Sequence, residues 1–494
     1  MTRNRKQSIL KPSSISNERG FMSSVGSNYR KERDSMGSMD VPSSAYYGAS
    51  TMRAVMNFPI STLRFSRTYI RSLALIKGAA SQVNVELGLL GKIIGDAISV
   101  AATEVAGGEL DGDFVIDIFQ TGSGTSTNMN ANEVIANRAS ELMGAARGKG
   151  KIHPNDHVNM CQSSNDVMPT AIHLAALMDI EERLIPSLRV LEQALMDKSE
   201  KFWGIVKTGR THLQDATPLR LGQEFYGYSG QISRAIKRLR YAQLELNEVA
   251  LGGTAVGTGI NAHPEFAKRV CALISEQTGV KIQETTNHFQ AQNTIDAIIT
   301  SSGILRTVGI SLYKIANDIR WLGSGPRAGL GELALPEVQP GSSIMPGKVN
   351  PVIPESVIQV VGQVIGNDTA ICNASYGSLF ELNMMLPVAA HNLLESINLL
   401  ATASANFSEQ CIVGLTATEN GPLMVERGLM LGTALAPAVG YDKAAYIAKK
   451  AAETGSTIRQ IAQAETSLSS SELDRILNPE KMTEPGLGIG LERS

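Results

Sequence analysis

The sequence predicts a mainly α-helical protein built around a bundle of long helices, and two observations support this fold class. Aromatic residues make up only 5% of the 494 residues, whereas residues that favour helices, such as alanine and leucine, are plentiful. Apolar residues also recur at helical spacing in long runs through the middle of the chain. A chain of this length exceeds what one hydrophobic core usually serves, so we expect two or three structural units.

Three apolar runs indicate three long amphipathic helices. The runs are Ile180, Leu184, Leu188, Leu191 and Leu195, then Ile232, Ile236, Leu239 and Leu246, then Ile304, Val308, Leu312, Ile315, Ile319 and Leu322. Residues at this spacing share one face of a helix. Several such helices joined by short loops favour an antiparallel bundle over an α/β fold. Because these helices carry more apolar surface than a single bundle hides, we expect a helical homo-oligomer.

The two ends of the chain differ from this helical middle. Residues 1–32 are basic, rich in serine and poor in acids, which predicts a disordered leader. A mitochondrial transit peptide is the alternative, but the leader lacks the apolar helical face of such a peptide, so we expect a cytoplasmic protein. Ordered structure is expected from about Arg33. After about Thr416 the shorter helical patterns indicate a small separate helical unit.

Composition excludes several classes of function. The formal net charge of −2 provides no strong field for nucleic acid or an acidic membrane surface. No run of eighteen apolar residues occurs, so no transmembrane helix is predicted. The cysteines form no CxxC cluster, which argues against a zinc or iron–sulfur site and against a disulfide scaffold. They are Cys161, Cys271, Cys372 and Cys411.

Polar islands interrupt the apolar pattern, and the one at residues 341–351, GSSIMPGKVNP, is the most informative. Its glycines and prolines predict irregular backbone. An ordinary surface loop is the alternative to a catalytic loop, since short motifs match by chance. Within the island and on the helix that follows, the residues able to do chemistry are Ser342, Ser343, Lys348, Asn350 and Glu355.

Two further islands place neutral hydrogen-bond donors in front of helices, where an anion is favoured. In residues 121–138 these donors are Ser123, Gly124, Thr125 and Asn128. In residues 153–166 they are Ser163, Ser164 and Asn165, ahead of a helix that we expect to start near Pro169. Helix capping is the alternative function for both sets.

Histidines occur in two of the islands. In residues 209–218, His212 has hydroxyl, amide and carboxylate neighbours, which favours a functional role over a buried structural one. His153 and His157 have the i, i+4 spacing of metal ligands, but Pro154 and Asn155 favour a turn there, so no metal site is predicted. Together the islands offer a serine loop, one histidine, one lysine and many neutral donors. Such a site would hold a small, doubly anionic molecule without a bound metal.

Several motifs resemble the fumarase/aspartase superfamily, and within it the class II fumarate hydratases. They are TGSGTSTNMNANEVIANR at 121–138, SSND at 163–166, GRTHLQDATPL at 209–219, LGGTAVGTGIN at 251–261 and GSSIMPGKVNP at 341–351. The resemblance extends from about Arg33 to about Pro479. It implies three domains, at 33–162, 163–418 and 419–494, and a tetramer whose active sites draw loops from three subunits.

The resemblance implies reversible hydration of fumarate to (S)-malate in the tricarboxylic acid cycle, with no cofactor. Ser342 would be the base that takes the C3 proton, and an aci-carboxylate intermediate would follow. His212, paired with Glu355, would activate the water, which Thr211 would help to hold. The substrate carboxylates would be held by Ser123, Gly124, Thr125, Ser163, Ser164, Asn165, Ser343, Lys348 and Asn350.

The same resemblance leaves two questions open. His153, Pro154, Asn155 and Asp156 match a second, non-catalytic dicarboxylate site, although Gly150 stands where some relatives have an arginine. Aspartate ammonia-lyase shares nearly every motif and is the alternative activity. TGSGT, SSND and His212 favour a fumarase, whereas the residues 352–354 before Glu355 are closer to the aspartase pattern.

Overall fold

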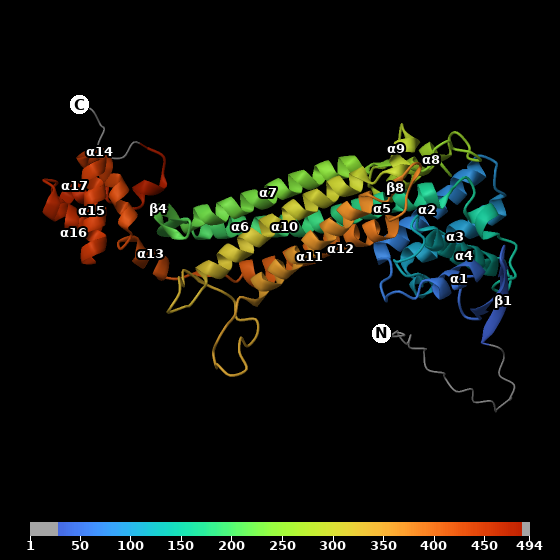
Figure 1. The fold of residues 1–494 in the computed structure, drawn as a ribbon, viewed down its shortest axis with the longest axis horizontal. Coiled ribbons are helices and arrows are strands. Elements are labelled where there is room, and N and C mark those ends of the chain that lie inside the picture. Colours follow the sequence, from blue (N-terminus) through green and yellow to red (C-terminus); the bar gives the residue numbers. More distant parts are fainter. Residues whose placement is uncertain (1–27, 487–494) are drawn as a thin grey trace, which may run out of the picture.

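The computed structural model describes residues 28–486, and its long helices form the centre of an elongated rod (Figure 1). These helices are α5 (Ser164–Asp179), α6 (Ile185–Lys201), α7 (Leu221–Leu246), α10 (Asp296–Leu322), α11 (Val352–Ser375) and α12 (Leu386–Phe407). Helix α10 packs against α7, α11 and α12, and α6 packs against α7 and α12. The predicted mainly helical fold with a long central bundle is confirmed.

The apolar runs occupy the bundle as predicted. The run from Ile180 to Leu195 passes through a π-helical turn that joins α5 to α6, and its residues are buried. The helix expected near Pro169 instead begins at Ser164, so that prediction is wrong by five residues. Pro169 lies inside α5, where its missing N–H removes one i→i−4 hydrogen bond from the helix.

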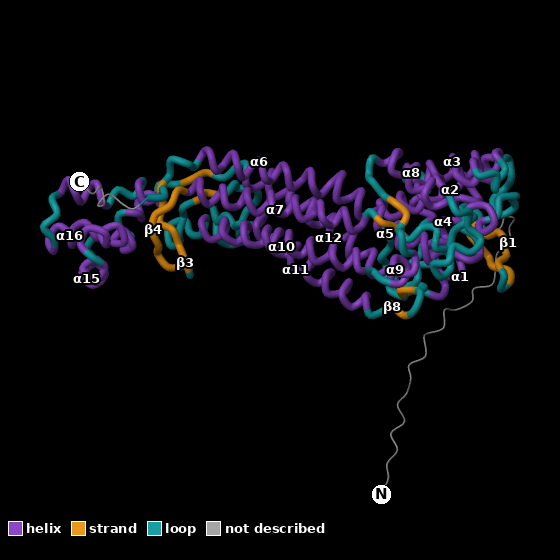
Figure 2. Tube along the Cα trace, turned by 90° about the horizontal axis from the view of Figure 1, so that it is seen from above, coloured by secondary structure: helices purple, strands orange, loops and turns teal. Residues whose placement is uncertain are grey.

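Further helices gather at the two ends of the rod, as Figures 1 and 2 show. The end that carries the N-terminal part contains α1 (Ala49–Asn57), α2 (Arg67–Glu86), α3 (Lys92–Gly107), α4 (Thr125–Leu142), α8 (Phe266–Thr278) and α9 (His288–Asn293). The other end contains α13 (Asn420–Val425), α14 (Ala436–Val439), α15 (Tyr441–Thr454), α16 (Ile458–Glu465) and α17 (Ser470–Ile476). Helices α13–α17 and their connections enclose a hydrophobic core of their own, separate from the core that runs through the rest of the rod. The three domain boundaries stay predictions.

The strands pair only in twos. Antiparallel pairs join β1 (Tyr29–Asp34) to β2 (Gly37–Pro42), β3 (Val206–Thr211) to β4 (Gln214–Arg220), β7 (Leu333–Ala334) to β10 (Thr416–Ala417), and β8 (Ser378–Leu379) to β9 (Leu382–Asn383). A parallel pair joins β5 (Glu248–Val249) to β6 (Gln283–Glu284). The hairpin β3–β4 is the largest addition to the fold that the sequence did not predict.

Ordered structure begins earlier than expected. Most of the predicted leader, residues 1–27, lies outside the described residues, but β1 starts at Tyr29 and not after Arg33. The cause is Arg30, whose guanidinium donates hydrogen bonds to the carbonyl oxygens of Pro42, Ala45 and Tyr47. The basic residues at the end of the leader therefore serve a structural purpose.

Candidate active site

A cradle of hydroxyl groups forms where α4 and α5 begin. The Oγ of Ser123 lies 2.7 Å from the Oγ1 of Thr125, which lies 2.8 Å from the Oγ of Ser164. Ser164 in turn donates to the Oδ1 of Asn165 at 3.3 Å. Helices α4 and α5 both begin here, so the positive ends of their dipoles lie at this point. Two islands separated by 35 or more residues thus form one site suited to a carboxylate.

The sequence dictates the local geometry of the cradle at Gly124 and Ser163. Gly124 has φ +75°, and a Cβ there would lie 2.3 Å from the Cε of Met168, so only glycine fits. Ser163 caps α5 in a capping box, in which its backbone N–H donates to Asp166 at 2.9 Å. Capping, one of the two alternatives that the sequence left open, is confirmed for Ser163, and anion binding stays a prediction.

Asp166 ties the cradle to a third segment, the glycine-rich loop at 252–261. Its Oδ2 accepts hydrogen bonds from the backbone N–H groups of Gly252 at 3.1 Å and Thr254 at 2.9 Å. Asn165 adds a hydrogen bond from its Nδ2 to the carbonyl oxygen of Ala255 at 2.8 Å. Sequence reasoning gave Asp166 no role, although its position three residues after Ser163 marks a capping box.

Lys77 of α2 lies behind the cradle with no exposed surface. Its Nζ donates to the Oδ1 of Asn159 and to the Oε1 of Gln162, both at 2.9 Å. Burial lowers the pKa of Lys77 to about 7, and the charge of Asp166 opposes this shift. Burial raises the pKa of Asp166 to about 6, against the hydrogen bonds from backbone N–H groups and the charge of Lys77. The sequence analysis missed Lys77.

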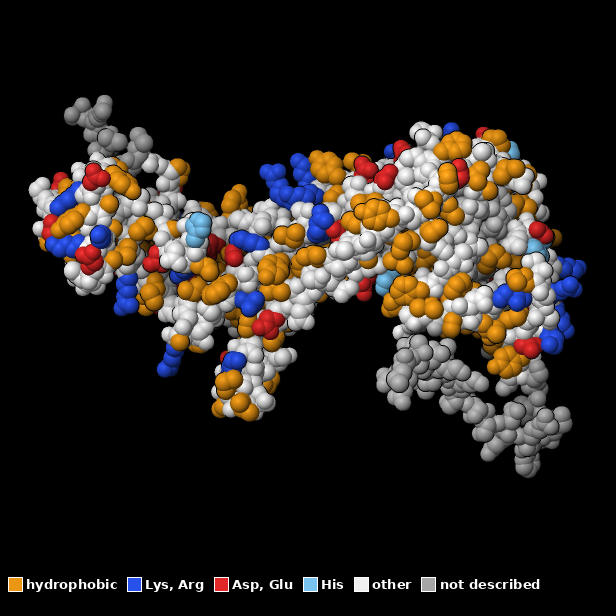
Figure 3. Space-filling model, viewed as in Figure 1, with side chains coloured by type: hydrophobic (Ala, Val, Ile, Leu, Met, Phe, Trp, Pro, Cys, Tyr) orange, Lys and Arg blue, Asp and Glu red, His pale blue; other side chains and the backbone are white. Residues whose placement is uncertain are grey.

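The loop between β7 and α11 carries Ser342 and projects from the side of the rod (Figures 1 and 3). The Oγ of Ser342 accepts hydrogen bonds from the backbone N–H groups of Ile344 at 3.2 Å and Met345 at 3.0 Å. These two donors favour a negative charge on that oxygen. Ile344 is 85% exposed, so the tip of the loop places an apolar side chain in solvent.

The base of this loop is closed by two hydrogen bonds. The backbone N–H of Gly341 donates to the carbonyl oxygen of Lys348 at 2.8 Å, and the Nδ2 of Asn350 donates to the carbonyl oxygen of Gly341 at 2.6 Å. A Cβ at Gly341 would lie 2.2 Å from that oxygen of Lys348, so the strands of the loop approach too closely for another residue. Ser343 and Lys348 are exposed on the closed loop.

His212 lies at the tip of the β3–β4 hairpin. Both residues of its two-residue turn have positive φ, +55° at His212 and +60° at Leu213. This turn type normally uses Asn-Gly, so a histidine and a leucine here hold strain of the kind found at functional sites. His212 and the preceding Thr211 are exposed.

A buried ion network fixes the hairpin to the segment that leads into the serine loop. The Nζ of Lys207 lies 2.8 Å from the Oε1 of Glu224 and 3.1 Å from the Oε2 of Glu332. Arg210 donates to the Oε1 of Glu332 at 2.6 Å. Lys207 and Glu332 are both almost completely buried, and β3 carries Lys207 and Arg210 just before His212.

The predicted site residues thus fall into two groups within one chain. Ser123, Gly124, Thr125, Ser163, Ser164 and Asn165 form the cradle at one end of the rod. The β3–β4 hairpin, which carries His212, lies toward the other end, as does the loop between β7 and α11, which carries Ser342 (Figure 1). Glu355, in the first turn of α11, is half-buried, and no hydrogen bond or ion pair joins it to His212 among residues 28–486.

The predicted second site lies at the start of the island at residues 153–166. Pro154–Val158 form a π-helical turn, in which the Nδ1 of His153 accepts a hydrogen bond from the N–H of Asp156 at 3.1 Å. The Nδ1 of His157 accepts one from the N–H of His153 at 2.9 Å. Both acceptor nitrogens are therefore used within the turn. In the described part of the chain, no group of three or more His, Cys, Asp or Glu residues could hold a metal ion.

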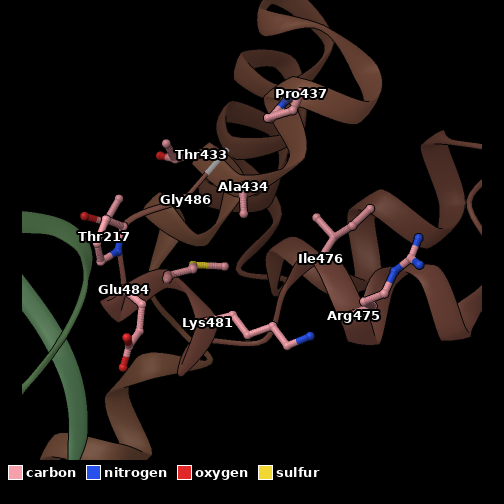
Figure 4. Close-up of a pocket in the computed structure, with 11 residues that line it drawn as sticks. Thr217, Thr433, Ala434, Pro437, Arg475, Ile476, Lys481, Glu484 and Gly486 are labelled. Carbon is pink, nitrogen blue, oxygen red and sulfur yellow. The ribbon is translucent and has the colours of Figure 1, made fainter. Parts of the chain in front are cut away.

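A cavity of about 540 Å³ lies apart from all of these residues, between β4 and the C-terminal helices (Figure 4). Thr217 of the hairpin contributes to one wall, and Arg475 of α17 and Lys481 contribute to others. None of the predicted site residues lines this cavity.

None of the helices in residues 28–486 is long and apolar enough to cross a membrane.

Comparison with known proteins agrees with the fold. Residues 37–366 match the family described as Lyase, and residues 431–484 match the family described as Fumarase C C-terminus. By class, therefore, the chain is a lyase. It is 53% identical over 467 residues to a class II fumarate hydratase of Halobacterium salinarum, covering 94% of this chain and 99% of that protein.

Further similarity specifies the family. The chain is 52% identical over 458 residues to a class II fumarate hydratase of Nitrosomonas europaea, covering 92% of this chain and 99% of that protein. A crystal structure of a class II fumarase from Schistosoma mansoni superposes with a TM-score of 0.89 at 38% identity, covering 92% of this chain and 99% of that one. The chain belongs to the class II fumarate hydratases, a family of hydro-lyases, which confirms the resemblance seen in its motifs.

Proposed function

We propose that this enzyme catalyses the reversible hydration of fumarate to (S)-malate, with Ser342 as the base at C3. The observation that carries this proposal is the pair of backbone N–H groups that donate to the Oγ of Ser342. A serine hydroxyl is too weak a base unless its charged form is favoured, and these two donors favour it. The names of the relatives support fumarate as the substrate.

The chemistry runs as follows in the dehydration direction. The Ser342 alkoxide takes the C3 proton, and the electrons of that C–H bond move into the adjacent carboxylate to give the aci-carboxylate. The C2–O bond then breaks, and the leaving hydroxide takes a proton through His212 and Glu355 to depart as water. The electrons return from the aci-carboxylate to form the double bond of fumarate. Lys348, Asn350, Ser343 and the cradle would stabilise the intermediate, because preorganised donors act most strongly where charge develops.

The separation of the two groups of residues supports a shared active site in a homotetramer. Within one chain the cradle and His212 lie toward opposite ends of the rod (Figure 1). The central helices also expose apolar side chains that a second copy could cover, namely Tyr226, Tyr241, Leu244, Ile310, Tyr313 and Ile365.

The proposal includes a cytoplasmic location and a place in the tricarboxylic acid cycle, which rest on the sequence and on the family.

The decisive experiment follows the ultraviolet absorbance of fumarate with purified enzyme. We expect fumarate to form from (S)-malate and not from aspartate. Formation from aspartate alone would identify an aspartate ammonia-lyase and refute the proposal. Treatment with a chelator should leave the rate unchanged, whereas a loss of rate would indicate a metal site and direct attention to His153 and His157.

A further inference from the structure

The three segments that surround the cradle are unusual in their charge. Residues 121–128, 163–166 and 252–261 contain no lysine or arginine, and their only charged residue is Asp166. The cradle therefore binds a carboxylate with neutral hydroxyl and N–H groups alone. A buried negative charge next to these groups would oppose the binding of a dianion.

Asp166 nevertheless has a structural reason to be there. It is completely buried and accepts hydrogen bonds from the backbone N–H groups of Ser163, Gly252 and Thr254. These bonds hold the start of α5 against the glycine-rich loop. A carboxylate that accepts several backbone N–H groups is stabilised in its charged form. The cradle thus obtains its shape from a group whose charge works against its ligand.

Lys77 is a buried cation near this carboxylate, because Gln162, which accepts from Lys77, immediately precedes Ser163, whose backbone N–H donates to Asp166. The charge of each residue opposes the shift that burial causes in the pKa of the other. The amide oxygens that accept from Lys77 belong to Asn159, which also accepts from Asn128 of α4 at 3.2 Å, and to Gln162, which immediately precedes Ser163. Lys77 is therefore linked to α4 through Asn159 and to the start of α5 through Gln162. It is too deeply buried to contact a ligand itself.

We propose that Lys77 is a positioning residue for dicarboxylate binding, which balances the charge of Asp166 so that the cradle accepts a dianion. The proposal rests on the proposed function for the identity of the ligand, a C4 dicarboxylate. Lys77 supplies the compensating charge from behind the helix N-termini, and the neutral donors supply the contacts. Removal of Lys77 leaves Asp166 uncompensated and weakens the dicarboxylate through repulsion.

A purely structural role for Lys77 predicts a different result, and a double variant that removes both charges distinguishes the structural role from the charge-balancing role. Lys77→Met removes the balancing charge, and Lys77→Met/Asp166→Asn removes both charges. If balance is what matters, the double variant binds the dianion better than the single variant, although it has lost more native interactions. If Lys77 only fills space and holds Asn159, the second substitution makes binding worse.

Lys198 provides a matched control. It is also a buried lysine, and its Nζ donates to the carbonyl oxygens of Val413 and Leu415, both at 2.8 Å, whereas the carboxylate whose charge acts on it, Asp197, is not part of the cradle. Lys198→Met should lower the thermal stability of the enzyme while KM stays near that of the wild type. Lys77→Gln is included in case Lys77→Met does not fold, because it keeps a donor for Asn159 without the charge.

The test measures KM and kcat for fumarate and, by calorimetry, the Kd for succinate, which cannot be hydrated. We expect Lys77→Met and Lys77→Gln to raise KM and Kd by about tenfold or more, with a smaller change in kcat, because one uncompensated charge acts on a dianion at short range. The double variant should return Kd to within about threefold of the wild type, because its cradle again has no net charge.

Three results would overturn the proposal: single variants with wild-type Kd, a double variant that binds no better than Lys77→Met, or loss of the folded enzyme in every Lys77 variant. Failure of the proposed function would look different. In that case the wild-type enzyme would not hydrate fumarate, whereas calorimetry with succinate would still report on Lys77.

Discussion

The cradle at the start of α4 and α5 and the serine loop before α11 contribute to the same proposed chemistry, yet they are built in opposite ways. The cradle is buried or half-buried, and hydrogen bonds between Thr125 and Ser164 and from Asn165 to Ala255 join it across segments of the same chain. The serine loop is exposed, and the side-chain hydrogen bonds of Ser342 and Asn350 stay within the loop. A single chain therefore forms the whole cradle, whereas it leaves the serine loop exposed.

This difference indicates a division of labour between binding and chemistry. A cradle fixed by backbone contacts can hold a carboxylate without reorganisation, which favours affinity. An exposed loop with a closed base can be placed against a second subunit as one unit, which favours correct positioning of the base. Substitutions in the loop should therefore change turnover and spare stability, whereas substitutions in the cradle should change both.

The largest effect on turnover is expected for Ser342→Ala. Removal of the base should lower kcat by about 100- to 10,000-fold, the usual contribution of general acid–base catalysis. The melting temperature should not change, because Ser342 makes hydrogen bonds only within its loop. Steady-state kinetics and thermal denaturation measure the two quantities. Gln339→Ala on the same exposed loop is the control and should keep wild-type turnover; wild-type turnover in Ser342→Ala would remove Ser342 from this role.

A smaller but still large effect is expected for Gly341→Ala. The new Cβ would collide with the carbonyl oxygen of Lys348, open the base of the loop and displace Ser342. A misplacement of about 1 Å can cost about 100-fold in rate, so kcat should fall by that order. Gly347→Ala is the matched comparison, since a Cβ there meets no atom within 4 Å although φ is +76°. Equal losses in the two variants would show that backbone strain, and not the closed base, matters.

In the cradle, Gly124→Ala should lower stability as well as activity. The added Cβ would lie 2.3 Å from Met168, and the residue would keep its positive φ. Overpacking of this kind costs about 1–3 kcal/mol. Urea denaturation should report that loss, and KM should rise because the start of α4 shifts. An unchanged unfolding free energy with impaired turnover would contradict the contrast between the two regions.

The smallest effect is expected at the hairpin turn, with Leu213→Gly. Glycine adopts φ of +60° without strain, so the free energy of unfolding should rise by up to about 1 kcal/mol. His212 keeps its position because the register from Thr211 to Gln214 is set by the strands. Denaturation and kinetics together test this. A loss of stability would show that Leu213 makes a favourable contact that outweighs the strain.

The sequence predicted the parts of this molecule that depend on local patterns. Apolar periodicity located the long helices, and the glycines and prolines of residues 341–351 predicted the irregular backbone found there. Periodicity could not reveal the β3–β4 hairpin, because its turn uses His212 and Leu213 where Asn-Gly is usual. A helix boundary was misplaced because Pro169, a residue that usually marks the first helical position, lies inside α5.

Lys77 shows why the rest of the site was out of reach. Its partners Asn159 and Gln162 lie more than eighty residues away, so no local motif joins them. One signal was present. Lys77 lies four residues after Leu73 and three before Ala80 on the apolar face of α2, where both neighbours are buried. A lysine at such a position needs a buried polar partner.

The central claim is that the cradle of one subunit and the serine loop of another form one active site for fumarate. Subunit mixing tests it most directly: inactive Ser342→Ala enzyme is denatured together with a cradle variant, Thr125→Ala/Asn165→Ala, and refolded. Random hybrid tetramers should recover about a quarter of wild-type fumarate hydration, because that fraction of sites receives an intact cradle and an intact loop from different subunits. Hybrids as inactive as the two parents would contradict the account.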